Sequence, residues 1–423
     1  MKKGFTFLLA TGLCALIQVG AAAQSKDVET PASPKTVDAG KASPAESVVL
    51  TTDELRDKLN DAKQLLKSQA DLSGGETVTL AVLDPQTSAL HLLTLQKDSF
   101  LTKDANLPLT SQLGRALRLT VIRANGVNTA VTVSDAATGQ TLTPLMVAYP
   151  IVRDGAVTEI AYYASAHPAL LSSEITGAGT SYVSTMLDKA ADSLSAKGVQ
   201  IPSDIVDIAQ HLCVVEHTDH KRFKTEQHSE LFPEILSLYA LNQGNTFRYS
   251  VSTAGAGGMI QMIPRTYEGI RQQHTNVPLQ ADFVDGMRNH TNALEAMLLY
   301  MNDTWNKLQE SQEVQDALRT GIATKPELLA AGYNSNPVRL PGYLKNGGSN
   351  WRTLIPAETQ MYLAIYAEVD RNVGFQSVGG DRLTSRQTTV GEFGMTSLQT
   401  STFMTWLSSR LLSGTSTLLR ILP

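Results

Sequence analysis

Residues 248–267 read RYSVSTAGAGGMIQMIPRTY, and this stretch carries the clearest indication of the fold and its chemistry. Three glycines, Gly255, Gly257 and Gly258, precede the apolar string MIQM, so we expect a tight turn that leads into a helix. A phosphate-binding loop does not fit, because the GxGxxG and Walker patterns are absent, as is the Lys-Ser/Thr pair. An ordinary tight turn is the plainer alternative.

The string from Val251 to Pro264 resembles the signature of the soluble lytic transglycosylases, the goose-lysozyme-like enzymes that cut peptidoglycan. Two more strings follow in the order found in that family. LLAAGYNSNP at 328–337 resembles its Ala-Tyr-Asn-x-Gly-Pro motif, and PAETQMYLAIYAEV at 356–369 resembles its Pro-x-Glu-Thr-x-x-Tyr-Val helix. The motifs lie in order over 216–369, so the resemblance is specific, but it does not cover the residues before 216.

The resemblance implies a mostly helical lysozyme-like domain with a cleft for a glycan strand. In such a domain the Gly-rich turn allows the backbone to approach the sugar closely. Gln261 would hydrogen-bond the N-acetyl or peptide groups, Tyr333 and Asn334 would line the cleft, and Tyr362 would pack or hydrogen-bond near the acid. The residues that the resemblance assigns to substrate binding are Gly258, Met259, Gln261, Tyr333, Asn334 and Tyr362.

The position of the catalytic acid has two interpretations. At the usual spacing of the family, the position of the glutamate holds Gln243, which would make the domain a catalytically inactive glycan-binding module. The preferred alternative is Glu216, followed by His217, with a helical insertion over about 224–243 before the Gly-rich motif. A branch of similar sequences has this layout, with a phrase like LNQGNTFRYSVSTAGAGG, which here spans 241–258.

Hydrophobic periodicity favours Glu216 as the acid. In the helix expected over 203–217, Ile208 and Leu212 belong to one apolar stripe, and Glu216 continues it four residues after Leu212. A carboxyl group on an apolar face loses solvation, which raises its pKa toward the value that a general acid needs. Gln243 also follows an apolar residue by four, so periodicity alone does not exclude it, and Glu226 and Glu230 are further candidates.

In the chemistry that the resemblance implies, one carboxyl group suffices. The acid protonates the glycosidic oxygen between MurNAc and GlcNAc. The resulting carboxylate then takes the proton from the MurNAc 6-hydroxyl, which attacks the anomeric carbon and closes a 1,6-anhydro ring. A hydrolytic lysozyme would use a second carboxylate, for which Asp219 and Asp303 are candidates.

No cofactor and no metal are expected. Four histidines lie close together in the sequence, but their spacing fits no HExxH pattern, and we expect His217 to orient or shield the acid, or to be exposed. The four are His211, His217, His220 and His228.

The rest of the chain indicates an exported α+β protein, with a mostly helical lysozyme-like domain preceded by a small mostly β domain. Lys2 and Lys3, an apolar run and Ala21-Ala22-Ala23 are typical of a secretory signal cleaved after Ala23, hence a periplasmic protein. Strings such as ETVTLAVL and ALRLTVIRA indicate strands, and Asp154-Gly155 indicates a hairpin. The expected divisions are a signal peptide over 1–23, a flexible linker over 24–50, an accessory mostly β domain over 51–175, the transglycosylase-like domain over 176–370, and a tail with one amphipathic helix over 371–423.

Composition excludes several classes of protein. The chain has 423 residues and a net charge of -5, so it lacks the basic surface of a nucleic-acid-binding protein. Its two cysteines exclude a disulfide scaffold and a multi-cysteine zinc site. The expected partners are peptidoglycan glycan strands and, through the β domain, other proteins of the cell envelope.

Overall fold

The computed structural model describes residues 51–70, 73–252 and 254–375. The chain is α+β, with strands in its first part and helices in the remainder. Residues 51–375 belong to one compact unit. The expected signal peptide and linker, and nearly all of the expected tail, lie outside the described residues. None of the described helices has the length and apolar character needed to cross a membrane.

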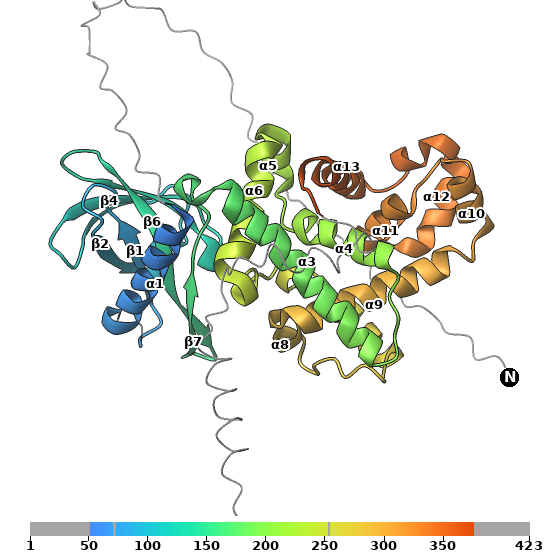
Figure 1. Cartoon of the computed structure of the whole chain (residues 1–423), viewed down its shortest axis with the longest axis horizontal. Helices are drawn as coiled ribbons and strands as arrows, with labels where there is room; N and C mark the ends of the chain where they lie inside the picture. The colour runs from blue at the N-terminus through green and yellow to red at the C-terminus, as the bar shows by residue number, and fades with distance from the viewer. Residues whose placement is uncertain (1–50, 71–72, 253, 376–423) are drawn as a thin grey trace, which may run out of the picture. The chain divides into compact units, whose positions relative to one another are not determined.

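The strands form one antiparallel sheet of seven strands in the order β2-β1-β6-β5-β4-β3, with β7 paired to β6 (Figure 1). Apolar and β-branched residues alternate with polar ones in β4 and β5, which gives each of these strands one buried face. The strands are β1 Thr77–Leu83, β2 Leu90–Gln96, β3 Asn106–Thr110, β4 Ala116–Arg123, β5 Ala130–Asp135, β6 Thr141–Arg153 and β7 Ala156–Tyr163.

The long strand β6 holds the sheet together, because it pairs with β1, β5 and β7. The predicted hairpin at Asp154-Gly155 is confirmed: Arg153 pairs with Ala156, and both turn residues have a positive φ, of 51° and 78°. Such a two-residue turn matches the twist of the strands that flank it. One face of the sheet packs against α1, through contacts of that helix with β1 and β6.

Helices follow from Ser173 onward, and α3 is the longest of those in the described part of the chain. It packs along α6, α9 and α4 (Figure 1). Its N-terminus is capped by Ser172, whose hydroxyl accepts from the backbone amide of Ile175. The helices are α1 Thr52–Gln69, α2 Lys97–Phe100, α3 Ser173–Ala196, α4 Ser203–Val215, α5 His220–Thr225, α6 His228–Asn242, α7 Pro264–Gln273, α8 Phe283–Arg288, α9 His290–Leu308, α10 Gln312–Arg319, α11 Lys325–Asn334, α12 Leu340–Gly347 and α13 Ala357–Asn372.

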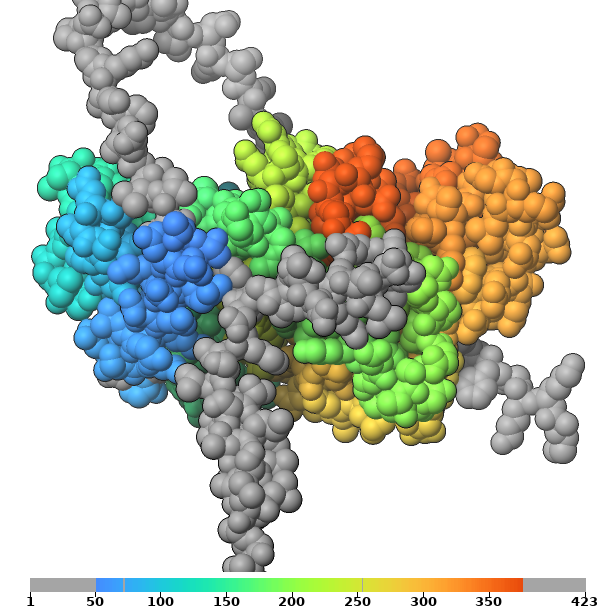
Figure 2. Space-filling view, in the orientation of Figure 1, coloured from blue at the N-terminus to red at the C-terminus, as the bar shows by residue number. Residues whose placement is uncertain are grey.

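The last helices pack around a second cluster of apolar side chains. Trp351 is fully buried there, and its indole nitrogen donates to the carbonyl of Ile322 at 3.2 Å. The neighbouring α13 contacts α4, α6 and α11. In Figure 2 the red surface of α13 lies between the yellow-green surface around residue 225 and the orange surface of the later helices. Through these contacts α13 joins α11 to α4 and α6.

The closest approach of α3 to α6 depends on Gly179. A Cβ atom at this position would lie 1.9 Å from the carbonyl oxygen of Leu236, a backbone atom that no rotamer change can move. Gly177, on the same helix, has no atom within 4 Å of the corresponding position. The two glycines therefore differ in packing while they share a helical environment.

We expect Gly179→Ala to lower the free energy of unfolding by about 2 kcal/mol or more, since it forces the two helices apart. Gly177→Ala should raise it by up to about 1 kcal/mol, because alanine has the higher helix propensity. Chemical denaturation of both variants measures the difference. Equal effects of the two substitutions would contradict the packing of α3 on α6.

Candidate active site

Glu216 lies at the end of α4, where that helix meets several later parts of the chain. It follows Val215 as the C-terminal cap and keeps a helical backbone, with φ of -60°. Leu212, one turn earlier, is fully buried, and the side chain of Glu216 is half-buried. The predicted continuation of the apolar stripe thus places a carboxyl group at the edge of the core.

The hydroxyl of Tyr362 donates a hydrogen bond of 2.6 Å to Oε1 of Glu216. Tyr362 comes from α13 and is 2% exposed, so this bond is shielded from solvent. The neighbouring Thr359 on the same helix donates to Oδ1 of Asn334 at 2.8 Å, which ties the end of α11 to α13. These contacts bring the second and third motifs of the sequence to the carboxyl group.

Burial raises the pKa of Glu216 to about 8. The hydrogen bond from Tyr362 opposes this effect, because it favours the charged form, while the negative charge of Glu358 adds to it. Glu358 precedes Tyr362 by four residues on α13, so both lie on one face of that helix. At neutral pH the carboxyl group is therefore mostly protonated and able to donate a proton.

His217 connects the acid to the Gly-rich turn. Its Nε2 donates to the carbonyl oxygen of Met259 at 3.0 Å, and its ring stacks on Phe247 with centroids 3.4 Å apart. Burial lowers the pKa of His217 to about 3, so the ring is neutral near pH 7. A neutral imidazole that stacks on one ring and donates from its edge positions the chain beside Glu216 without adding charge.

Two glycines of the Gly-rich turn, Gly257 and Gly258, pack against α8. Gly258 has a φ of 69°, and a Cβ atom there would lie 2.4 Å from the carbonyl oxygen of Met287. A Cβ atom at Gly257 would lie 3.3–3.4 Å from side-chain atoms of Phe283 and Met287. The side chain of Met259 is fully buried, so its carbonyl oxygen, which accepts from His217, is the atom that contributes to the site.

The expected helix starts later than its sequence suggested. Residues Gly258–Ile260 form a short 3-10 turn, and α7 begins at Pro264. Between them Gln261 adopts the left-handed conformation, with φ of 45° and ψ of 40°. Its Nε2 donates to the carbonyl of Gly258 at 2.8 Å and to Oγ of Ser250 at 3.3 Å. The side chain of Gln261 thus closes the turn on itself and remains half-exposed.

Strained backbone is concentrated in this segment. Gln243, Phe247 and Gln261 are non-glycine residues with φ between 45° and 53°. Such residues are uncommon, and each costs on the order of 1–3 kcal/mol, which surrounding contacts must offset. One of the three, Phe247, is the residue whose ring stacks on His217.

Tyr333 completes the group around the acid. Its hydroxyl donates to the carbonyl of Ile260 at 2.8 Å, and its ring packs edge-on against Tyr300. Burial, followed by the negative charge of Glu216, raises the pKa of Tyr333. Tyr333 therefore stays a neutral donor that joins α11 to the Gly-rich turn.

The other acids considered from the sequence are engaged elsewhere. Glu226 pairs with Arg222, and Glu230 is exposed on α6. Asp219 accepts from the amides of residues 221 and 222 at the start of α5, and Asp303 contacts His274 at 2.7 Å. Gln243 ends α6. Of these acids, Glu216 is the one that accepts a hydrogen bond from Tyr362 of the third motif.

The four clustered histidines do not form one group in the structure, and His220 begins α5. His211 contacts Asp370 at 3.2 Å, His217 contacts Met259, and His228 contacts Glu368 at 3.4 Å. Within the described ranges, no group of three or more His, Cys, Asp or Glu side chains could hold a metal ion.

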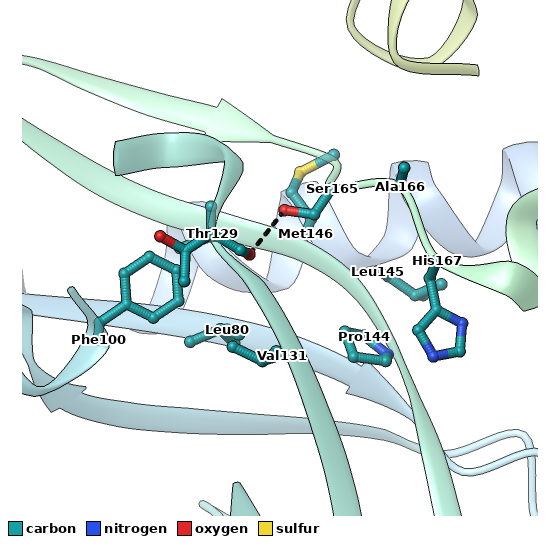
Figure 3. Close-up of a pocket in the computed structure, with 11 residues that line it drawn as sticks. Leu80, Phe100, Thr129, Val131, Pro144, Leu145, Met146, Ser165, Ala166 and His167 are labelled. Carbon is teal, nitrogen blue, oxygen red and sulfur yellow. Dashed lines mark hydrogen bonds between the residues drawn. The ribbon is translucent and has the colours of Figure 1, made fainter. Parts of the chain in front are cut away.

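A hollow lies in the strand region, away from Glu216 (Figure 3). The hydroxyl of Ser165 donates to the carbonyl of Thr129 at 3.3 Å, and Nδ1 of His167 accepts from the amide of Ala169 at 3.2 Å. No carboxyl group lines this hollow, so it offers less for acid–base chemistry than the surroundings of Glu216. Its apolar walls include Leu80, Phe100, Val131, Pro144, Leu145, Met146 and Val147.

Comparison of the chain with known proteins identifies no relative. The chain matches no model of a known protein family, no curated protein and no solved structure. The assignment of a function therefore depends on the residues and their geometry.

Some residues of the site had no signal in the sequence. Phe247, which stacks on His217, and Ser250, which accepts from Gln261, lie just before the Gly-rich motif. Both contacts join residues at least 11 positions apart, which no local pattern reports.

Glu216→Gln should stabilise the fold, by an amount that grows with pH. Below the ordinary pKa of 4.5, Glu216 is protonated in both the folded and the unfolded state. Between 4.5 and about 8 the unfolded state releases the proton first, so the wild type loses stability as the pH rises, at up to about 1.4 kcal/mol per unit.

We expect the variant to be more stable by about 1–3 kcal/mol at pH 8 and by little near pH 4.5. Denaturation curves at both values measure this. Glu230→Gln, on the exposed face of α6, should stay within about 0.5 kcal/mol of the wild type. A gain that does not depend on pH would contradict the raised pKa of Glu216.

Proposed function

We propose that this protein is an exported peptidoglycan lytic transglycosylase, which cleaves the bond between MurNAc and GlcNAc and leaves 1,6-anhydroMurNAc ends. The observation that supports this most is the 2.6 Å hydrogen bond from Tyr362 to Glu216, a carboxyl group whose pKa burial raises to about 8. The resemblance assigned these residues to the acid and to its neighbour. Their meeting across the fold is what that assignment requires.

Glu216 acts first as an acid. The hydroxyl of Tyr362 donates a hydrogen bond to Oε1, so the acidic proton resides on Oε2. From Oε2 it passes to the glycosidic oxygen. The bond from that oxygen to the anomeric carbon of MurNAc breaks, and GlcNAc leaves with the proton. Positive charge that develops on the sugar ring is then balanced by the new carboxylate.

Glu216 acts second as a base. The carboxylate removes the proton of the MurNAc 6-hydroxyl as its oxygen bonds to the anomeric carbon. The anhydro ring closes, Glu216 is protonated again, and no water is consumed. Tyr362 keeps its proton throughout, because burial and the charge of Glu216 raise its pKa, so it stabilises the carboxylate as a hydrogen-bond donor.

The remaining motif residues would bind the glycan. Gln261, Tyr333 and Asn334 are all half-exposed, and each is held by a hydrogen bond to the Gly-rich turn or to α13. Such held side chains lose little freedom on binding. We assign Gly258 and Met259 to the shape of the turn, and the helices from α3 onward to a lysozyme-like domain.

Two other outcomes remain open to the test. A binding module without activity would follow if Gln243 occupies the position of the acid. A hydrolytic lysozyme would follow if a water molecule, activated by a second carboxylate, attacks the sugar. The strand region is proposed to contact other proteins of the cell envelope, and the chain to act in the periplasm after cleavage at Ala23.

Digestion of purified sacculi, with mass spectrometry of the soluble products, distinguishes these functions. We expect anhydro ends from the wild type and a loss of at least about 1000-fold with Glu216→Gln, since the amide cannot donate the proton. Glu230→Gln should act like the wild type. Reducing ends would assign a hydrolase, and no soluble product from the wild type would assign a binding module.

The pH profile tests the acid itself. Because the free enzyme must hold the proton, kcat/KM should be level at neutral pH and fall about tenfold per unit above about 8. Tyr362→Phe removes the hydrogen bond that favours the carboxylate, so the midpoint of this fall should move to higher pH. A midpoint that moves to lower pH would contradict the role of Tyr362.

A further inference from the structure

Three arginines from separate elements converge beside the Gly-rich turn. Arg153 ends β6, Arg248 lies just before the turn, and Arg288 ends α8. Arg248 and Arg288 approach the carboxylate of Glu159 on β7 at 3.6 and 3.9 Å. These separations exceed the length of a hydrogen bond, so the pairs are loose.

The donors of this cluster are largely unused. The hydroxyl of Tyr249, at 2.6 Å, is the group that donates to Glu159. Within residues 51–70, 73–252 and 254–375, none of the three guanidinium groups donates a hydrogen bond to a protein acceptor, and Nε of Arg248 is buried without a partner. Arg248 and Arg288 instead lie over the ring of Tyr249, 5.8 and 5.2 Å from its centroid. A buried guanidinium atom without an acceptor favours the binding of an anion.

The charges of the cluster do not balance. Three guanidinium groups face two carboxylates, Glu159 and Asp285, the latter 3.9 Å from Arg153. Burial lowers the pKa of Arg288, and the positive charge of Arg153 lowers it further, because like charges repel. One surplus positive charge matches a single carboxylate better than it matches a phosphate, which carries up to two negative charges.

The cluster is joined directly to the site around Glu216. The carbonyl of Ser250, two residues after Arg248, accepts from the amide of Gly258 at 3.0 Å. The hydroxyl of Ser250 accepts from Gln261. If a ligand lies along the Gly-rich turn, its side groups would therefore reach the three guanidinium groups.

We propose that Arg153, Arg248 and Arg288 bind a free carboxylate on the peptide attached to the glycan strand. This inference rests on the proposed function, because the peptide is attached to the MurNAc residue beside the bond that would be cut. It predicts a preference for glycan that carries peptides with free carboxylates. Guanidinium groups suit this role, since they bind a carboxylate through paired donors.

Cleavage of three substrates tests the proposal with the full chain. They are glycan strands with native peptides, strands freed of peptides by an amidase, and strands whose peptide carboxylates are amidated. The wild type should show a kcat/KM at least about tenfold higher on the first than on the other two. Arg248→Gln and the half-exposed Arg153→Gln should lower this preference to about twofold or less.

The control is Arg319→Gln, on the exposed face of α10, which should keep the full preference. Equal rates of the wild type on all three substrates would overturn the proposal while leaving the proposed function intact. Absence of any cleavage, even of the peptide-free strands, counts against the proposed function instead.

A binding measurement tests the carboxylate site separately from the proposed cleavage activity. Titration of Glu216→Gln with a soluble peptide that carries a free carboxylate should show saturable binding, which Arg248→Gln weakens by about tenfold or more. Inorganic phosphate serves as the rival anion. Binding of phosphate without the peptide, or of neither, would overturn the carboxylate site.

Discussion

The hydrogen bond between Tyr362 and Glu216 is the contact on which the site depends, because it joins residues 146 positions apart and closes α13 onto α4. A carboxyl group at the edge of an apolar core is costly when it is charged and modest in cost when it is protonated. Among residues 51–70, 73–252 and 254–375, Tyr362 is the side chain that donates to it and no cation lowers its pKa, so the protonated form prevails at neutral pH. The packing that stabilises the fold also sets the proton that the proposed chemistry uses.

The sequence predicted the features that depend on neighbouring residues. The apolar stripe that ends in Glu216 predicted the direction of its pKa shift, and Asp154-Gly155 predicted the hairpin of β6 and β7. In each case a local rule, the helical period or the left-handed preference of a turn, is stronger than any distant contact.

The features that depend on distant contacts could not be predicted. The helix after the Gly-rich turn begins at Pro264 rather than directly after the glycines, because Gln261 takes a left-handed conformation that its own hydrogen bonds hold. The glycine at 258 is required by the carbonyl of Met287, on a short helix whose six residues give no periodic pattern. The partner of His217 is likewise a backbone atom 42 residues away.

The strained backbone at Gln243, Phe247 and Gln261 depends both on local conformation and on distant contacts. Backbone in a left-handed conformation is retained where surrounding contacts determine it more strongly than its own preferences do. Here Phe247 packs against His217, and Gln261 bonds to Ser250, so the strain is held by residues that adjoin the acid on one side and the arginines on the other. The same stretch of backbone therefore adjoins both the proton donor and the three arginines to which a carboxylate site is proposed.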